Sequence, residues 1–134
     1  MVVRHLDAAG FETLLRDLRA ELEPRRDLEF AYVYGSVLRG AGFRDVDVAL
    51  WTTLDAAPDV DLDVGRVLSA RTGLSVDVRR INDAPTSFLF HVVRGALLLV
   101  RDETRLADII ERTARQYHDL APLRLRAIRE AFVA

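Results

Sequence analysis

Two aspartates, two residues apart, are the feature of the sequence that could most directly do chemistry. Asp45 and Asp47 open the run Asp-Val-Asp-Val-Ala-Leu, which has the pattern of a strand. Side chains of a strand alternate between its two faces, so both carboxylates are expected on one face. Two like charges side by side repel each other unless a cation lies between them. Carboxylate oxygens suit Mg²⁺, which usually binds together with substrate phosphates.

A Gly-Ser turn ahead of the aspartates is a candidate phosphate site. Gly35 and Ser36 follow the apolar run Phe-Ala-Tyr-Val at residues 30–33 and precede a short polar loop with two glycines. Glycine lets the backbone approach a ligand closely, and free N–H groups in a turn bind phosphate oxygens. The turn and the two aspartates together indicate magnesium-dependent chemistry on a phosphorylated substrate.

The order of these residues resembles the signature of the DNA polymerase β-like nucleotidyltransferases. The signature here reads Gly35-Ser36, two residues, Arg39-Gly40, four residues and Asp45-Val46-Asp47. It is most similar to the minimal nucleotidyltransferase (MNT) domains, many of which are antitoxins encoded beside a HEPN-domain toxin. Arg44 departs from that pattern, which often has Ser before the first Asp, but this position is not a metal ligand there. The resemblance covers residues 28–100 well and the C-terminal helices more loosely.

The resemblance implies a site of three carboxylates. In that family a third carboxylate comes from a strand beside the first pair, and Asp77 is the residue that fits this position. Asp45, Asp47 and Asp77 are then expected to hold two Mg²⁺ ions, with Asp77 also helping to deprotonate the incoming hydroxyl. Gly35 and Ser36 would hold the triphosphate of ATP. Arg39 would contact a phosphate or remain solvated. The implied reaction is nucleotidyl transfer with release of pyrophosphate.

The size of the chain indicates which kind of molecule would accept the nucleotide. Almost nothing lies outside the minimal core, so an acceptor that brings its own binding surface is favoured over a small molecule. By the resemblance, the partner would be a HEPN ribonuclease toxin, forming a hetero-oligomer, and AMP would be transferred from ATP to one of its tyrosines. Two alternatives remain open. The chain could be a non-catalytic antitoxin module that occludes the toxin, or it could modify a small molecule such as an aminoglycoside.

Hydrophobic periodicity predicts the elements that position these residues. Helices are expected at residues 7–23, 58–72, 86–94, 103–117 and 123–133, and strands at 29–34, 45–51, 75–81 and 96–100. Asp7 is the expected N-cap of the first helix, and Gly73 is expected to end the second. The expected fold is α+β with a mixed sheet, helices on one face and the active site on the other. Residues 1–134 would form a single domain, with a core at about 28–100 and C-terminal helices at about 103–133.

Several further side chains have predicted positions. Val60, Val64, Val67 and Leu68 should point inward from the second helix. Trp51 shares the face of the aspartates and would either border a nucleotide or pack as an ordinary core residue. The final helix would use Leu123, Ile128 and Phe132 to contact a partner or to cap the core. The three histidines, which lack ligand spacing, are expected outside the site: His5, His91 and His118.

Composition excludes some classes of function. The 134 residues include no cysteine, so disulfides, zinc–thiolate sites and thiol nucleophiles are excluded. A net charge of −2 provides no global basic field, so direct nucleic-acid binding is not expected. No apolar run approaches a membrane span, and the N-terminus lacks the apolar stretch of a signal peptide. The expected location is therefore the cytoplasm.

Overall fold

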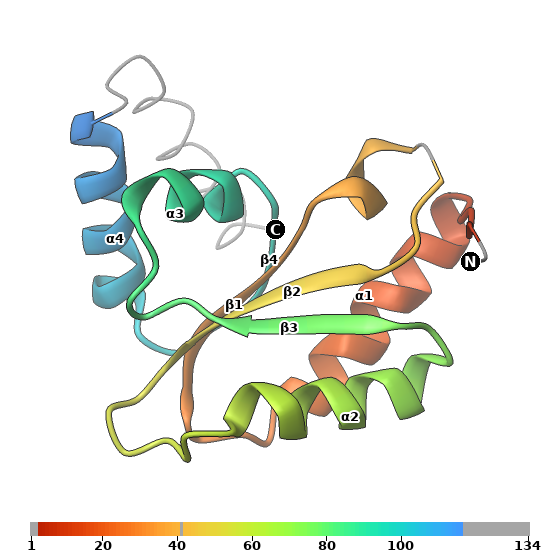
Figure 1. Cartoon of the computed structure of the whole chain (residues 1–134), viewed down its shortest axis with the longest axis horizontal. Helices are drawn as coiled ribbons and strands as arrows, with labels where there is room; N and C mark the ends of the chain where they lie inside the picture. The colour runs from red at the N-terminus through yellow and green to blue at the C-terminus, as the bar shows by residue number, and fades with distance from the viewer. Residues whose placement is uncertain (1–2, 41, 117–134) are drawn as a thin grey trace.

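A four-stranded mixed sheet forms the centre of the molecule, as the computed structural model shows for residues 3–40 and 42–116 (Figure 1). The strands are β1 (Leu28–Tyr34), β2 (Val46–Thr52), β3 (Val76–Arg80) and β4 (Ala96–Val100), in the order β3-β2-β1-β4. β1 is antiparallel to β2 and β4, and β2 is parallel to β3. The predicted α+β fold and its mixed sheet are confirmed, and β4 lies at one edge of the sheet.

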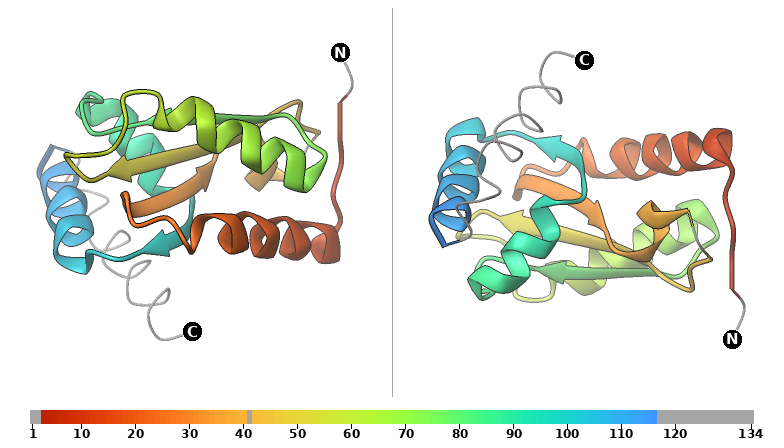
Figure 2. Two further views of the ribbon diagram at one scale, coloured as in Figure 1. Left: turned by 90° about the horizontal axis from the view of Figure 1, so that it is seen from below. Right: turned by 90° about the horizontal axis from the view of Figure 1, so that it is seen from above.

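Helices cover both faces of the sheet, rather than the single face that was predicted (Figure 2). α1 (Ala8–Leu22) and α2 (Val60–Thr72) pack on one face, against Val33, Val46 and Val48. α3 (Thr86–Val93) and α4 (Glu103–Gln116) pack on the other, against Phe30 and Tyr32. The physical reason lies in β1, whose run Phe-Ala-Tyr-Val-Tyr is apolar on both faces and so requires cover on both.

The helices begin and end close to the predicted residues. Asp7 caps α1 by accepting a hydrogen bond from the Gly10 N–H at 2.7 Å, and Gly73 ends α2 with a φ of 72°. Val67 is 38% exposed, so its predicted inward position is wrong. The buried stripe of α2 is narrow, because its members are spaced four residues apart: Val60, Val64 and Leu68.

Two segments differ from the prediction. Ser36–Arg39 form a short 3₁₀ helix, η1, where a polar loop was expected. β2 begins at Val46, so Asp45 lies immediately before the strand and not within it.

The predicted helix at 123–133 lies outside the described residues, as does Tyr117, the last residue of the helix predicted at 103–117. Within residues 3–40 and 42–116, no helix is long and apolar enough to cross a membrane.

Side chains of α1 tie this helix to its neighbours. Arg19 donates hydrogen bonds to two main-chain carbonyl oxygens of the edge strand β4, those of Leu97 at 3.0 Å and Leu98 at 3.1 Å. Asp17 and Glu21 both form ion pairs with Arg71 of α2, at 3.3 and 2.9 Å. These contacts fix α1 against both the sheet edge and α2.

Candidate active site

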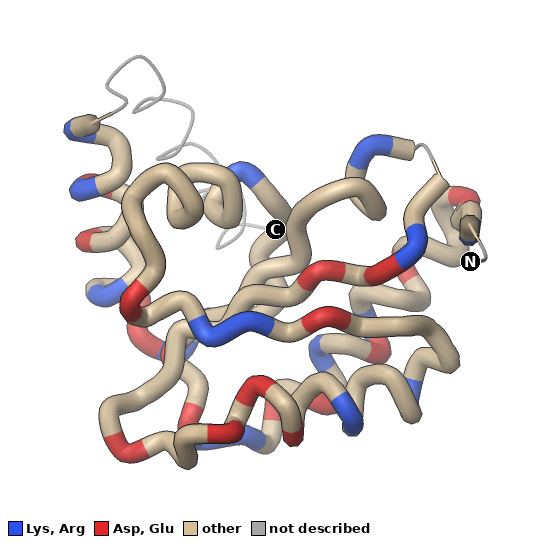
Figure 3. Tube along the Cα trace, in the orientation of Figure 1, with Lys and Arg blue, Asp and Glu red and all other residues tan. Residues whose placement is uncertain are grey.

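The sheet register brings the predicted carboxylates together. Asp47 of β2 lies opposite Asp77 on the parallel strand β3, and opposite Tyr34 on the antiparallel strand β1. Asp45 lies just before β2, where its Oδ1 accepts a hydrogen bond from the Ser75 hydroxyl at 2.7 Å. Figure 3 shows acidic residues on the neighbouring strands β2 and β3. The expectation that Asp77 stands beside the first pair is therefore met in the geometry of the strands.

Burial and repulsion act together on Asp47. Its pKa is raised above the ordinary range of an aspartate, first by burial and then by the charges of Asp77 and Asp45. Arg79 and His91 act in the opposite direction. Asp45 and Asp77 are thus both close enough to Asp47 to repel its charge, and the repulsion between Asp45 and Asp47 was predicted from the sequence. A bound cation would relieve this repulsion.

The three carboxylates do not converge on one point, because two of them have other partners. Ser75 holds Asp45, and Arg79 lies 3.7 Å from Asp77 as an ion pair in which both side chains are well exposed. Among the described residues, no group of three or more His, Asp or Glu side chains is arranged to hold a metal ion. The donor set and its repulsion fit Mg²⁺. To share an ion, Asp45 and Asp77 would have to exchange their present partners for it.

Gly35 is required at the start of η1 for two reasons. Its φ of 85° and ψ of −152° belong to a region that is open almost only to glycine. In addition, a β carbon at this position would lie 2.6 Å from Oδ2 of Asp47. The turn therefore leaves space for a carboxylate of the candidate site, besides the backbone approach to phosphate that the sequence predicted.

A pocket of about 210 Å³ opens beside this turn. It is lined by residues of η1 and of the last turn of α3, namely Gly35, Leu38, Arg39, His91, Arg94 and Gly95. The structure thus brings Gly35 and Arg39 together, whereas Ser36 begins η1 and is not among the lining residues. His91, expected outside the site, lines this pocket. The sequence carried no signal for it, because only the packing of α3 across the sheet brings His91 near the turn.

Tyr34 lies next to both the pocket residue His91 and the carboxylate of Asp47, its register partner on β2. Its ring makes edge-on contacts with His91 and Phe88, with ring centroids 5.5 and 5.7 Å apart. Burial, followed by the charge of Asp47, raises the pKa of Tyr34 to about 12. The hydroxyl therefore stays protonated at neutral pH, and it adds no further negative charge beside Asp47.

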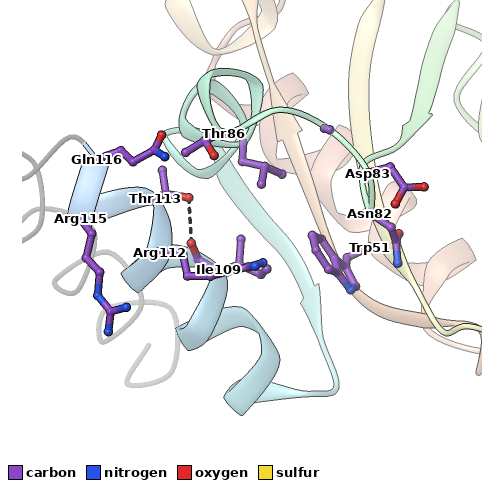
Figure 4. Close-up of a pocket in the computed structure, with 11 residues that line it drawn as sticks. Trp51, Asn82, Asp83, Thr86, Ile109, Arg112, Thr113, Arg115 and Gln116 are labelled. Atoms are coloured by element: carbon purple, nitrogen blue, oxygen red, sulfur yellow. Dashed lines mark hydrogen bonds between the residues drawn. The ribbon is translucent and has the colours of Figure 1, made fainter.

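A larger pocket, of about 490 Å³, lies away from the predicted site residues (Figure 4). Trp51 lines it together with Asn82 from the turn after β3 and Arg112 from α4. Trp51 is only 8% exposed, and its ring stacks on Phe30 with centroids 5.6 Å apart. Of the two predicted positions for Trp51, the structure supports that of a packed core residue.

The mixed sheet, with acidic residues on adjacent strands beside a glycine turn, is the arrangement expected of a nucleotidyltransferase domain. Residues 16–104, which include the turn and all three aspartates, match the family described as polymerase beta, nucleotidyltransferase. This match spans more than half of the chain, and the protein belongs to that family. The sequence matches no curated protein.

Solved toxin–antitoxin structures share the fold. A chain from a toxin–antitoxin structure with AMP-PNP is 20% identical, with a TM-score of 0.64 over 90% of this chain and 98% of that one. A chain from the complex of tri-AMPylated Shewanella oneidensis HEPN toxin with MNT antitoxin is 18% identical, with a TM-score of 0.61 over 92% and 98%. A chain of the toxin–antitoxin MntA–HepT is 19% identical, with a TM-score of 0.60 over 92% and 99%. At sequence identities this low, the TM-scores establish a common fold and nothing beyond it.

Proposed function

We propose that this protein is an antitoxin that transfers AMP from ATP to a tyrosine hydroxyl of a HEPN ribonuclease toxin. The observation that carries the proposal is the register of Asp47 against Asp77, directly beside the glycine turn at Gly35. Its supports are the nucleotidyltransferase family and the likeness to chains from toxin–antitoxin complexes, one with AMP-PNP and one with an AMPylated toxin. The likeness extends over at least 90% of this chain in each case.

Different residues of the candidate site would bind the metal ions, accept the proton and hold the triphosphate. Asp45, Asp47 and Asp77 would hold two Mg²⁺ ions, which when bound stabilise the negative charge on the reacting phosphates. The tyrosine oxygen forms a bond to the α-phosphorus, and the bond from that phosphorus to the oxygen of the β-phosphate breaks. Asp77 accepts the proton of the hydroxyl, and pyrophosphate leaves. Gly35, Ser36 and Arg39 would hold the triphosphate.

AMP attached to a tyrosine would account for neutralisation of a ribonuclease. The modification adds a bulky group with a negative charge, which repels the RNA backbone if it lies near the RNA-binding surface. A protein acceptor also brings its own binding surface, which suits a domain that consists of little more than one sheet and its covering helices.

One observation favours a second candidate function, a binding module that occludes the toxin without catalysis. Asp45 and Asp77 are engaged by Ser75 and Arg79, so the carboxylates are not arranged around a common point. In that case the toxin would be neutralised without ATP, and the acidic cluster would have no role in neutralisation.

Intact mass spectrometry of the toxin separates the two functions. The chain is incubated with Mg²⁺, ATP and its toxin partner, in parallel with Asp77→Asn and with an Asp45→Asn/Asp47→Asn double variant. Asp108→Asn on the exposed face of α4 is the matched control. We expect the wild type and the control to add the mass of one or more AMP groups to the toxin, and the site variants to add none. Neutralisation by the double variant, with no change of toxin mass for any protein, would instead establish the binding module.

A further inference from the structure

The pocket beside Gly35 is lined by three basic side chains from two elements. Arg39 comes from η1, whereas His91 and Arg94 come from the end of α3. Elsewhere, arginines such as Arg25 and Arg71 are held in ion pairs with carboxylates. Within residues 3–40 and 42–116, no salt bridge joins a carboxylate to Arg39, His91 or Arg94. Arg39 and Arg94 therefore bring positive charge to the pocket, and neither forms a salt bridge with a described carboxylate.

The packing of α3 and of the turn after it fixes where His91 and Arg94 lie relative to the carboxylates. His91 and Arg94 are three residues apart, which places them on the same side of α3. The turn that follows is held close to β1, since a β carbon at Gly95 would collide with the carbonyl oxygen of Val33. The His91 ring contacts Tyr34, whose register partner on β2 is Asp47. Tyr34 thus adjoins a basic residue of the pocket and a carboxylate of the candidate site.

The helix dipole explains only part of this arrangement. Basic residues at the end of a helix are stabilised by its partial negative charge, which would account for His91 and Arg94 as surface residues. It does not account for the convergence of Arg39, from a separate element, on the same pocket. A multiply charged anion would satisfy all three groups at once, and guanidinium groups are well suited to phosphate.

We propose that His91 and Arg94 bind the β- and γ-phosphates of the nucleotide, together with Arg39, and then hold the pyrophosphate product. The identification of the anion as part of ATP depends on the proposed function. The α-phosphate would lie beside the carboxylates, which Gly35 of the pocket adjoins. His91 and Arg94 are thereby assigned as binding residues, contributed by an element outside the glycine turn and the aspartate strand.

Isothermal titration calorimetry on the full chain tests the assignment with three probes in the presence of Mg²⁺: ATP, inorganic pyrophosphate and AMP. We expect His91→Gln and Arg94→Gln each to weaken ATP and pyrophosphate binding about tenfold, the loss typical of one charged hydrogen bond. Binding of AMP, which lacks the two outer phosphates, should remain at the wild-type level. Arg66→Gln on α2, away from the pocket, is the matched control and should bind all three probes normally.

The outcomes distinguish this assignment from the proposed function. Selective loss of ATP and pyrophosphate binding supports it. Unchanged ATP binding in both variants overturns it, and so does an equal loss for AMP, which would indicate a general structural effect. A wild-type chain that binds neither ATP nor pyrophosphate also overturns it. If the selective loss is observed but the toxin gains no AMP, the phosphate pocket is supported and the proposed transfer is overturned. Arg94→Gln, at an exposed helix end, keeps the test decisive should His91→Gln fold poorly.

Discussion

Burial and neighbouring negative charge act together on Asp47 in the candidate site. It lies between Tyr34 and Asp77 in the sheet, and its side chain is close to the position that a β carbon of Gly35 would occupy. A charged group in such a place lowers the stability of the fold unless a cation accompanies it. Without a cation, an ionised Asp47 is therefore expected to cost stability.

The stability of an Asp47→Asn variant should depend on pH in a defined direction. The pKa of Asp47 is raised in the folded state, by burial first and then by Asp77 and Asp45. Its contribution to stability is therefore fully present below the ordinary carboxyl pKa and is lost as pH rises through the raised value. At pH 7 without Mg²⁺ we expect the variant to be more stable than the wild type, with the difference shrinking toward about pH 4.

Urea unfolding at both pH values, with a chelator present, measures this difference. Asp108→Asn serves as the control, because its exposed carboxylate lies away from the site on α4, and it should show no comparable gain. Equal stability of wild type and Asp47→Asn at pH 7 would contradict the electrostatic description of the site.

Single residues show where prediction from sequence succeeds and where it fails. The spacing of Asp45 and Asp47 predicted two neighbouring carboxylates, because the period of a strand fixes which side chains share a face. The family resemblance, and not a local pattern, predicted Asp77 beside them. His91 and Arg94 could not be found this way. They reach the pocket only through the packing of α3 across the sheet, which no local pattern encodes.

At the scale of elements, the connection from β1 to η1 depends on Gly35. This residue combines a positive φ with a close side-chain neighbour, Asp47. Gly73 also has a positive φ, 72°, but a β carbon there would meet nothing within 4 Å. Gly73→Ala should therefore cost only the backbone strain, about 1–2 kcal/mol of unfolding free energy. Gly35→Ala should cost more, since its backbone region excludes alanine and the new β carbon would displace Asp47.

Denaturant unfolding and AMP transfer, measured on both variants, test this difference. We expect Gly73→Ala to keep transfer near the wild-type level and Gly35→Ala to lose most of it. If Gly35→Ala folds normally and transfers AMP at the wild-type rate, the turn does not support the carboxylate.

Strands and long helices were predicted well, because their apolar periods extend over many residues. η1 was missed, since its four residues are too few to show a period. The prediction also missed that helices cover both faces of the sheet. The apolar run of β1 is consistent with two-sided burial, but it does not say which helices provide the second layer.

At the scale of the whole molecule, the candidate site should couple ligand binding to folding. A ligand that binds only the folded chain stabilises it by about 2.7 kcal/mol at a concentration of 100 times Kd. We expect Mg²⁺ and ATP together to raise the melting temperature of the wild type, and to have little effect on the Asp45→Asn/Asp47→Asn variant. Thermal melts with Mg²⁺ alone, ATP alone and both ligands provide the comparison. Equal gains for both proteins would place the nucleotide elsewhere.

The hydrogen bonds from Arg19 have a consequence for how this molecule meets others. β4 is an edge strand, and exposed edges pair readily with strands of other molecules and promote aggregation. Arg19 occupies the carbonyl oxygens of Leu97 and Leu98 with a charged side chain from α1. An incoming strand would have to displace the guanidinium before it could pair there. The helix that covers one face of the sheet is therefore also expected to hinder self-association through the β4 edge.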